Sequence, residues 1–146
     1  MSVYQEDISK LFKHLLLKYE THITEVNDRG LKLDRMSILE ISLLEYLRDN
    51  QGVTQQGLME VVDIKRKKST SVINKLIRSG LIQKVDNPQD KRSNWMQLTQ
   101  QGIRYLKAYK DHEANLVAFV LKDMTVNEEK AIVKFLSKIN QTDYLK

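Results

Sequence analysis

The chain has 146 residues, of which 41% are hydrophobic and 29% charged, a composition typical of one globular domain rather than a disordered chain. It contains no cysteine, which excludes disulfides, thiolate metal ligands and a thiol redox switch. No apolar run approaches the ~18 residues of a membrane span. Because Glu6 and Asp7 follow the N-terminus closely, a secretory signal is not expected either, and we expect a cytoplasmic protein.

The positive charge is concentrated in one part of the chain. Residues 61–95 hold nine Lys or Arg against three Asp, a net charge of +6. Residues 1–60 have a net charge of −3 and residues 96–146 a net charge of +2, which leaves +5 for the whole chain. A local excess of this kind indicates a polyanionic partner, although a basic cluster taken alone is as often a solvated surface.

Two helices are expected in the first third of the chain. Residues 5–26 carry apolar side chains at steps of three and four, which predicts an amphipathic helix that ends before Gly30. Asp34 is expected to cap a second helix that runs to about Asp49. The candidate core residues of this second helix are Ile38, Ile41, Leu44, Tyr46 and Leu47.

The next segment predicts a helix-turn-helix. Thr54 is expected to cap a short helix that runs to about Val61. A basic helix follows within a few residues and ends at Gly80, with Val72, Ile73, Leu76 and Ile77 on its inner face. Two helices this close together, the second polar and basic on its outer face, are typical of this motif.

A small hairpin and two further helices complete the pattern. Residues 81–85 and 95–98 read as strands around a polar loop, with Met96 and Trp95 on opposite faces. Thr99 is expected to cap a long helix to about Lys122, and Thr125-Val126-Asn127-Glu128 is a capping box for a last helix.

Three short motifs in this order resemble the MarR family of bacterial transcription regulators. They are Thr54…Leu58-Met59 in the short helix, Leu76…Gly80-Leu81-Ile82 at the end of the basic helix, and Asp86…Asp90-Lys91-Arg92…Leu98-Thr99-Gln100-Gln101-Gly102 in the wing and the start of the long helix. Each motif alone is weak, but their order and spacing together make the match fairly specific, and the resemblance covers nearly the whole chain.

The resemblance implies a mainly α fold with a small antiparallel β hairpin. It implies a winged helix-turn-helix DNA-binding lobe over residues 33–98 and a helical dimerisation region over residues 1–32 and 99–146. A homodimer of this kind would place two recognition helices in successive major grooves of a near-palindromic site. We therefore predict a sequence-specific DNA-binding regulator of transcription, most simply a repressor.

The basic helix supplies most of the predicted DNA contacts. Arg or Lys can read guanine and Asn can read adenine in the major groove. Arg66, Lys67, Ser71 and Asn74 are therefore candidate base readers, with Thr70 on the same side. Lys65, Lys68 and Lys75 are assigned to phosphates. For Asn74 an exposed helix residue without a ligand is an equal alternative.

The wing supplies a second predicted contact. The resemblance implies that the Asp90 carboxylate orients Arg92 so that its guanidinium enters a minor groove, with Lys91 beside it. Narrow A·T-rich minor grooves concentrate negative potential and attract such an arginine. The alternative is an Asp-Arg turn pair without a ligand.

Relatives in the family commonly release DNA when a small molecule binds between the dimerisation helices and the DNA-binding lobe. Tyr19, Tyr46, Tyr105 and Tyr109 are candidates to line such a space, although aromatic residues at helical spacing are more often core residues. The histidines are His14, His22 and His112, and a metal site shared between two chains is one alternative for them. Solvated or core histidines are much more common, so neither a metal nor another cofactor is expected.

Two other classes of function were compared with DNA binding. A winged helix that binds an acidic protein would explain the basic helix, but it would leave the cationic wing tip without a role. An enzyme is not expected, because paired carboxylates, a Gly-rich phosphate loop and a Ser-His-Asp set are all missing from the sequence. The operator, the effector and the regulated genes are not specified by the sequence.

Overall fold

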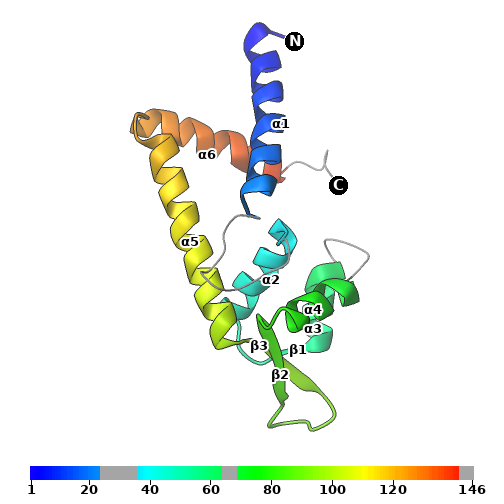
Figure 1. Cartoon of the computed structure of the whole chain (residues 1–146). Coiled ribbons are helices and arrows are strands. Elements are labelled where there is room, and N and C mark those ends of the chain that lie inside the picture. Colours follow the sequence, from blue (N-terminus) through cyan, green and yellow to red (C-terminus); the bar gives the residue numbers. More distant parts are fainter. Residues whose placement is uncertain (24–35, 64–68, 142–146) are drawn as a thin grey trace. The chain divides into compact units, whose positions relative to one another are not determined.

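The computed structural model describes residues 1–23, 36–63 and 69–141. Its elements are six helices and a small antiparallel sheet, as the sequence predicts (Figure 1). The chain divides into two compact units, Met1–Lys110 and Asp111–Lys146. Within the described residues, none of the helices combines the length and apolar character that a membrane span requires.

The first unit contains the helices that the sequence places before and inside the lobe. They are α1 (Val3–Ile23), α2 (Ile38–Asp49), α3 (Gln55–Asp63) and α4 (Ser69–Arg78). Gly30 and Asp34 lie outside the described residues. The N-cap of α2 is Ser37, whose side chain accepts a hydrogen bond from the Glu40 amide while the Glu40 carboxylate accepts one from the Ser37 amide. This Ser-x-x-Glu capping box replaces the expected Asp34 cap.

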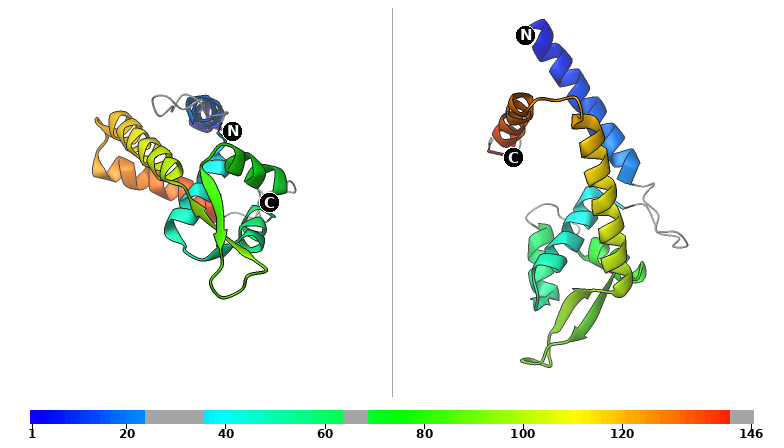
Figure 2. Two further views of the ribbon diagram at one scale, coloured as in Figure 1. Left: turned by 60° about the horizontal axis from the view of Figure 1, so that its bottom comes forward. Right: turned by 90° about the vertical axis from the view of Figure 1, so that its left-hand side faces the viewer.

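The sheet has three strands and not two. They are β1 (Val53–Thr54), β2 (Ile82–Asp86) and β3 (Asn94–Leu98), in the order β1-β3-β2 with antiparallel pairing throughout. The sequence predicts β2 and β3 but not β1, because a strand of two residues has no periodicity to detect. The β2–β3 loop extends beyond the helices in both views of Figure 2 and forms the wing.

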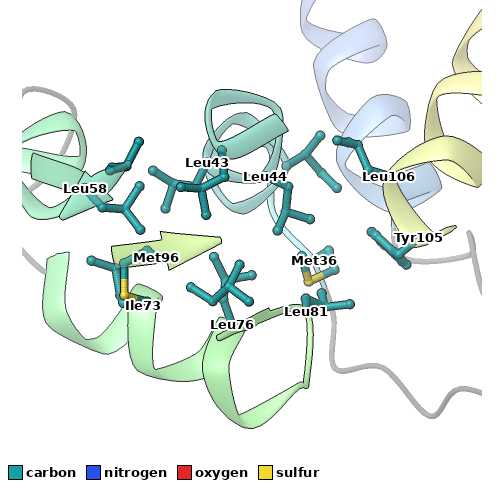
Figure 3. Close-up of a cluster of buried hydrophobic side chains, with 14 of the residues drawn as sticks. Met36, Leu43, Leu44, Leu58, Ile73, Leu76, Leu81, Met96, Tyr105 and Leu106 are labelled. Atoms are coloured by element: carbon teal, nitrogen blue, oxygen red, sulfur yellow. The ribbon is translucent and has the colours of Figure 1, made fainter. Parts of the chain in front are cut away.

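The core of the lobe lies between α2, α3, α4, the sheet and the start of α5 (Gln100–Leu121), as Figure 3 shows. Ile41, Leu44 and Leu47 are buried as predicted, whereas Ile38, the first residue of α2, is exposed. The sequence stripe missed Leu43, which is fully buried beside Leu44. The complete set of buried apolar residues is Met36, Ile41, Leu43, Leu44, Leu47, Val53, Leu58, Ile73, Leu76, Leu81, Ile82, Met96, Tyr105, Leu106 and Tyr109.

The start of α5 is hydrogen-bonded to the turn that follows α4 and packs closely against it. The Thr99 hydroxyl donates a hydrogen bond to the Gly80 carbonyl and accepts one from the Gly102 amide, so it caps α5 as predicted. A methyl group at Gly102 would lie only 2.0 Å from the carbonyl oxygen of Leu81. The Leu-Thr-x-x-Gly pattern therefore has a physical basis, since only glycine allows α5 to approach the backbone this closely.

The second unit holds the end of α5 and α6 (Val126–Gln141). The predicted capping box is confirmed: the Thr125 amide donates to Glu128 at 2.7 Å, and the Glu128 amide donates to the Thr125 hydroxyl at 3.2 Å. No residue of α6 is buried. Large apolar side chains stay exposed on this unit, namely Val117, Phe119, Val120, Met124, Val126, Val133, Phe135 and Leu136.

Candidate nucleic-acid interface

Helix α4 separates an apolar inner face from a polar outer face. Ile73 and Leu76 are fully buried in the core, and Val72 and Ile77 pack against it, as predicted. Among the polar positions, Ser71 and Asn74 are exposed, where the prediction requires base readers to lie. The helix therefore has the amphipathic character of a recognition helix laid on a hydrophobic core.

The end of α4 is fixed by a glycine turn. Gly80 has a φ of 72°, a left-handed conformation that glycine adopts without steric cost. The Gly80 amide donates to the carbonyl of Ile77 at 3.0 Å, and the Leu81 amide donates to that of Leu76 at 3.1 Å. This pair of bonds is a Schellman motif, and it directs the chain from α4 straight into the wing.

Lys75 lies in a different environment from the one predicted for a phosphate contact. Its Nζ donates to both carboxylate oxygens of Glu40, at 2.9 and 3.0 Å. The Glu40 side chain is 8% exposed and that of Lys75 is 23% exposed, so the pair is largely buried. The structure thus joins α4 to α2 through Lys75, a contact that helical periodicity does not reveal because its two residues are 35 positions apart.

The wing loop is organised from within by Asn87. This side chain is 8% exposed. Its amide nitrogen donates to the Ser93 hydroxyl at 3.0 Å, and its oxygen accepts from the Gln89 amide at 2.9 Å. Asn87 is not among the residues predicted from the sequence, although an Asn before a proline is a known signal for this kind of turn.

Asp90 shapes the wing tip through the backbone. Its carboxylate accepts a hydrogen bond from the Arg92 amide at 2.9 Å. Within the part of the chain that the structure describes, the Arg92 guanidinium forms no ion pair with Asp90 or with any other carboxylate. Asp90, Lys91 and Arg92 are all exposed. Asp90 therefore fixes the turn from which Arg92 projects, and the guanidinium itself stays available to an anion.

The remaining predicted contacts are made by residues or side chains that the structure does not describe. Lys65, Arg66, Lys67 and Lys68 lie outside the described residues. Thr70 belongs to α4, but its side chain is outside the description as well. The structure thus locates Ser71, Asn74, Lys75, Asp90, Lys91 and Arg92 from the predicted set.

The tyrosines proposed for an effector site are placed mostly in the core. Tyr105 and Tyr109 are buried among the lobe's apolar residues, and Tyr46 is partly buried against this apolar core. Burial, with a smaller contribution from the negative charge of Glu40, raises the pKa of Tyr105 to about 12. The side chain of Tyr19 lies outside the description. Among the described residues no cluster of His, Asp and Glu is arranged to hold a metal ion.

Comparison with known proteins gives consistent matches. Residues 36–93 match the model of the MarR family. The chain is 20% identical over 133 residues to a Bacillus subtilis protein described as the uncharacterized HTH-type transcriptional regulator YwhA, covering 91% of this chain and 95% of that protein.

Two solved structures show the same fold at low sequence identity. Streptococcus pneumoniae FabT in complex with DNA is 22% identical, with a TM-score of 0.70, and the match covers 94% of this chain and 93% of FabT. The PcaV transcriptional regulator from Streptomyces coelicolor, in complex with its natural ligand, is 20% identical, with a TM-score of 0.65 and coverage of 93% and 92%.

Proposed function

We propose that the chain is a member of the MarR family, whose model matches residues 36–93, and that it is a sequence-specific, double-stranded DNA-binding regulator of transcription. The observation that carries the proposal is the pairing, within one lobe, of an outward polar face on α4 with a wing tip whose cations have no carboxylate partner among the described residues. Similarity to FabT, whose structure contains DNA, supports the same reading.

The proposed DNA contacts divide by chemistry. Ser71 and Asn74 read base edges from the exposed face of α4, together with Thr70 of the same helix and with Arg66 and Lys67, which precede it in the sequence. Lys65 and Lys68 neutralise phosphates. Arg92 enters a minor groove, with Lys91 beside it, from the turn that Asp90 holds by accepting the Arg92 amide.

We further propose a homodimer that acts as a repressor on a near-palindromic operator. Exposed apolar side chains on α1, the second half of α5 and α6 support this, because monomeric proteins rarely expose so much apolar surface. In this proposal residues 1–32 and 99–146 form the dimerisation region and residues 33–98 the lobe, although the start of α5 also contributes Tyr105, Leu106 and Tyr109 to the lobe's core.

A small-molecule effector is a separate part of the proposal. The PcaV structure contains a natural ligand, which supports ligand control as a property of this fold. Because Tyr105 and Tyr109 are core residues here, they are not assigned to the effector, and we propose no lining residues.

The test is selection of bound sequences from a random duplex pool, followed by a binding titration of the selected site. Arg92→Ala should weaken binding about tenfold or more, since each phosphate or groove contact by a cation contributes strongly at low salt. Lys107→Ala removes the same charge from an exposed position on α5 and serves as the matched control. Retention of an acidic protein but of no duplex would favour the protein-binding alternative.

A further inference from the structure

The contact between Lys75 and Glu40 is unusual for a residue of a recognition helix. Both oxygens of the Glu40 carboxylate accept from Lys75 Nζ, at 2.9 and 3.0 Å. A lysine used for phosphate neutralisation is expected to extend its ammonium into solvent. Here the ammonium points into the lobe, because its partner side chain is only 8% exposed.

Glu40 is itself held from the other side. Its Oε2 accepts the Ser37 amide at 3.1 Å, and its own amide donates to the Ser37 hydroxyl at 3.2 Å. The carboxylate is also close enough to Tyr105 to add to the rise of that side chain's pKa. A carboxylate so constrained cannot follow Lys75 outward. Removing the ammonium would leave its charge buried without compensation, which is strongly unfavourable.

The pair is also placed where it controls the orientation of α4. The inner face of α4 rests on the core through Ile73 and Leu76, and apolar contacts of this kind are not directional. A charge-assisted hydrogen bond is directional. Lys75 directly follows Asn74 and is one helical turn beyond Ser71, so it fixes the rotation of the helix at the level of the exposed polar side chains.

From this geometry we propose that Lys75 is a positioning residue and not a phosphate contact. Its ion pair with Glu40 ties the recognition helix to the N-terminus of α2 and thereby sets the direction in which Ser71 and Asn74 meet the bases. The inference rests on the proposed DNA-binding function and replaces the phosphate role predicted for Lys75. It assigns Glu40, a buried residue of α2, to sequence discrimination.

The decisive variant is Glu40→Gln, because the two roles of Lys75 predict opposite results. Glutamine preserves the capping box with Ser37 but removes the charge that holds Lys75. If Lys75 positions α4, affinity for the selected duplex falls about tenfold, the factor expected for one impaired base contact, while affinity for an unrelated duplex is unchanged. If Lys75 neutralises a phosphate, releasing it leaves the affinity unchanged or increases it, and the proposal is overturned.

The second variant is Lys75→Met, for which the salt dependence of DNA affinity is measured. The slope of log affinity against log salt should equal that of the Lys107→Met control, because no phosphate contact is lost. A slope shallower by about 0.9 would show one lost phosphate contact and would refute the inference. The double variant Glu40→Gln with Lys75→Met should lose about as much specific affinity as either single variant, since all three remove one interaction.

Thermal unfolding of the unmodified protein, Glu40→Gln, Lys75→Met and the double variant separates this inference from the function it rests on. If the unmodified protein binds no duplex, the proposed function fails. Independently of that result, a coupling free energy near zero between the two substitutions, measured from the unfolding of the four proteins, refutes the ion pair. If it binds, unchanged affinity of both folded single variants, after correction for the unfolded fraction, makes the pair merely structural and overturns the proposal. Lys75→Arg, which keeps the charge and can still reach Glu40, should recover most of the discrimination.

Discussion

The lobe and the C-terminal unit use the same kinds of residues in opposite ways. In the lobe, apolar side chains from three helices, the sheet and the start of α5 close a core within one chain. In Asp111–Lys146, α6 buries none of its residues, and Phe135 and Leu136 stay 40% and 43% exposed. The difference shows that the apolar core of the lobe is completed within one chain, whereas the apolar residues of the C-terminal unit stay uncovered within one chain, as the proposed homodimer would require.

The largest expected effect on the stability of the lobe comes from Gly102→Ala. The new methyl group would lie 2.0 Å from the Leu81 carbonyl oxygen, so α5 or the exit from α4 must move. We expect a loss of about 3 kcal/mol in the free energy of unfolding, measured by urea denaturation. Gly57→Ala is the control, because its methyl group would meet nothing closer than the Thr54 hydroxyl at 3.3 Å. Similar losses for the two variants would refute the close-approach explanation of the Leu-Thr-x-x-Gly pattern.

For the C-terminal unit the corresponding test is Phe135→Ser. If this face is covered by a second copy, the dimer dissociation constant should rise about 30-fold, because an aromatic anchor at an interface contributes about 2 kcal/mol. Sedimentation equilibrium over a range of protein concentrations measures the change. Lys134→Ser alters the adjacent exposed position and should leave association nearly unchanged. A monomeric unmodified protein would break the comparison between the two units.

The lobe was predicted more completely from sequence than the contacts that orient it. Helical spacing identified Ile41, Leu44, Ile73 and Leu76 as core residues, because burial of an amphipathic stripe is a local property of the sequence. The same spacing assigned Ile38 to the core, but this residue at the start of α2 is 48% exposed. A one-dimensional pattern therefore identifies the buried face better than it identifies where that face begins.

Polar contacts between distant segments were not predictable in this way. The ion pair of Lys75 with Glu40 joins two helices, and nothing in either local pattern distinguishes this lysine from its basic neighbours. The wing gave a mixed result: its motif predicted that Asp90 acts on Arg92, and the structure shows that the contact is made to the Arg92 amide. The Ser37 cap, by contrast, is visible in the sequence as a Ser-x-x-Glu pattern, so the expected Asp34 cap is wrong for a local reason and not for a long-range one.

A pH experiment tests how tightly the lobe core is closed. Burial raises the pKa of Tyr105 from its ordinary value of 10.0 to about 12, so the folded state favours the neutral phenol. The stability from this preference is complete below about pH 10 and is lost as the pH rises toward 12, because the unfolded chain releases its proton first. We expect a loss of about 2 kcal/mol across this window, measured by urea titrations at each pH. Tyr105→Phe should flatten this part of the profile, and an unaltered profile would contradict the assignment.

The smallest effects come from the two capping boxes, which place the same chemistry in the two units. Ser37→Ala removes the cap of α2 within the lobe and should cost about 1 kcal/mol, whereas Thr125→Ala acts on an exposed helix start, where caps contribute about 0.5 kcal/mol. Trp95, the single tryptophan, lies on β3 in the lobe, so its fluorescence follows unfolding of that unit. Ser37→Ala should lower the urea midpoint seen by Trp95, while Thr125→Ala should leave it in place and lower only the helical signal in circular dichroism. Equal shifts of the Trp95 midpoint would mean that the two units unfold as one, and the contrast between a self-sufficient lobe and a dependent C-terminal unit would then be lost.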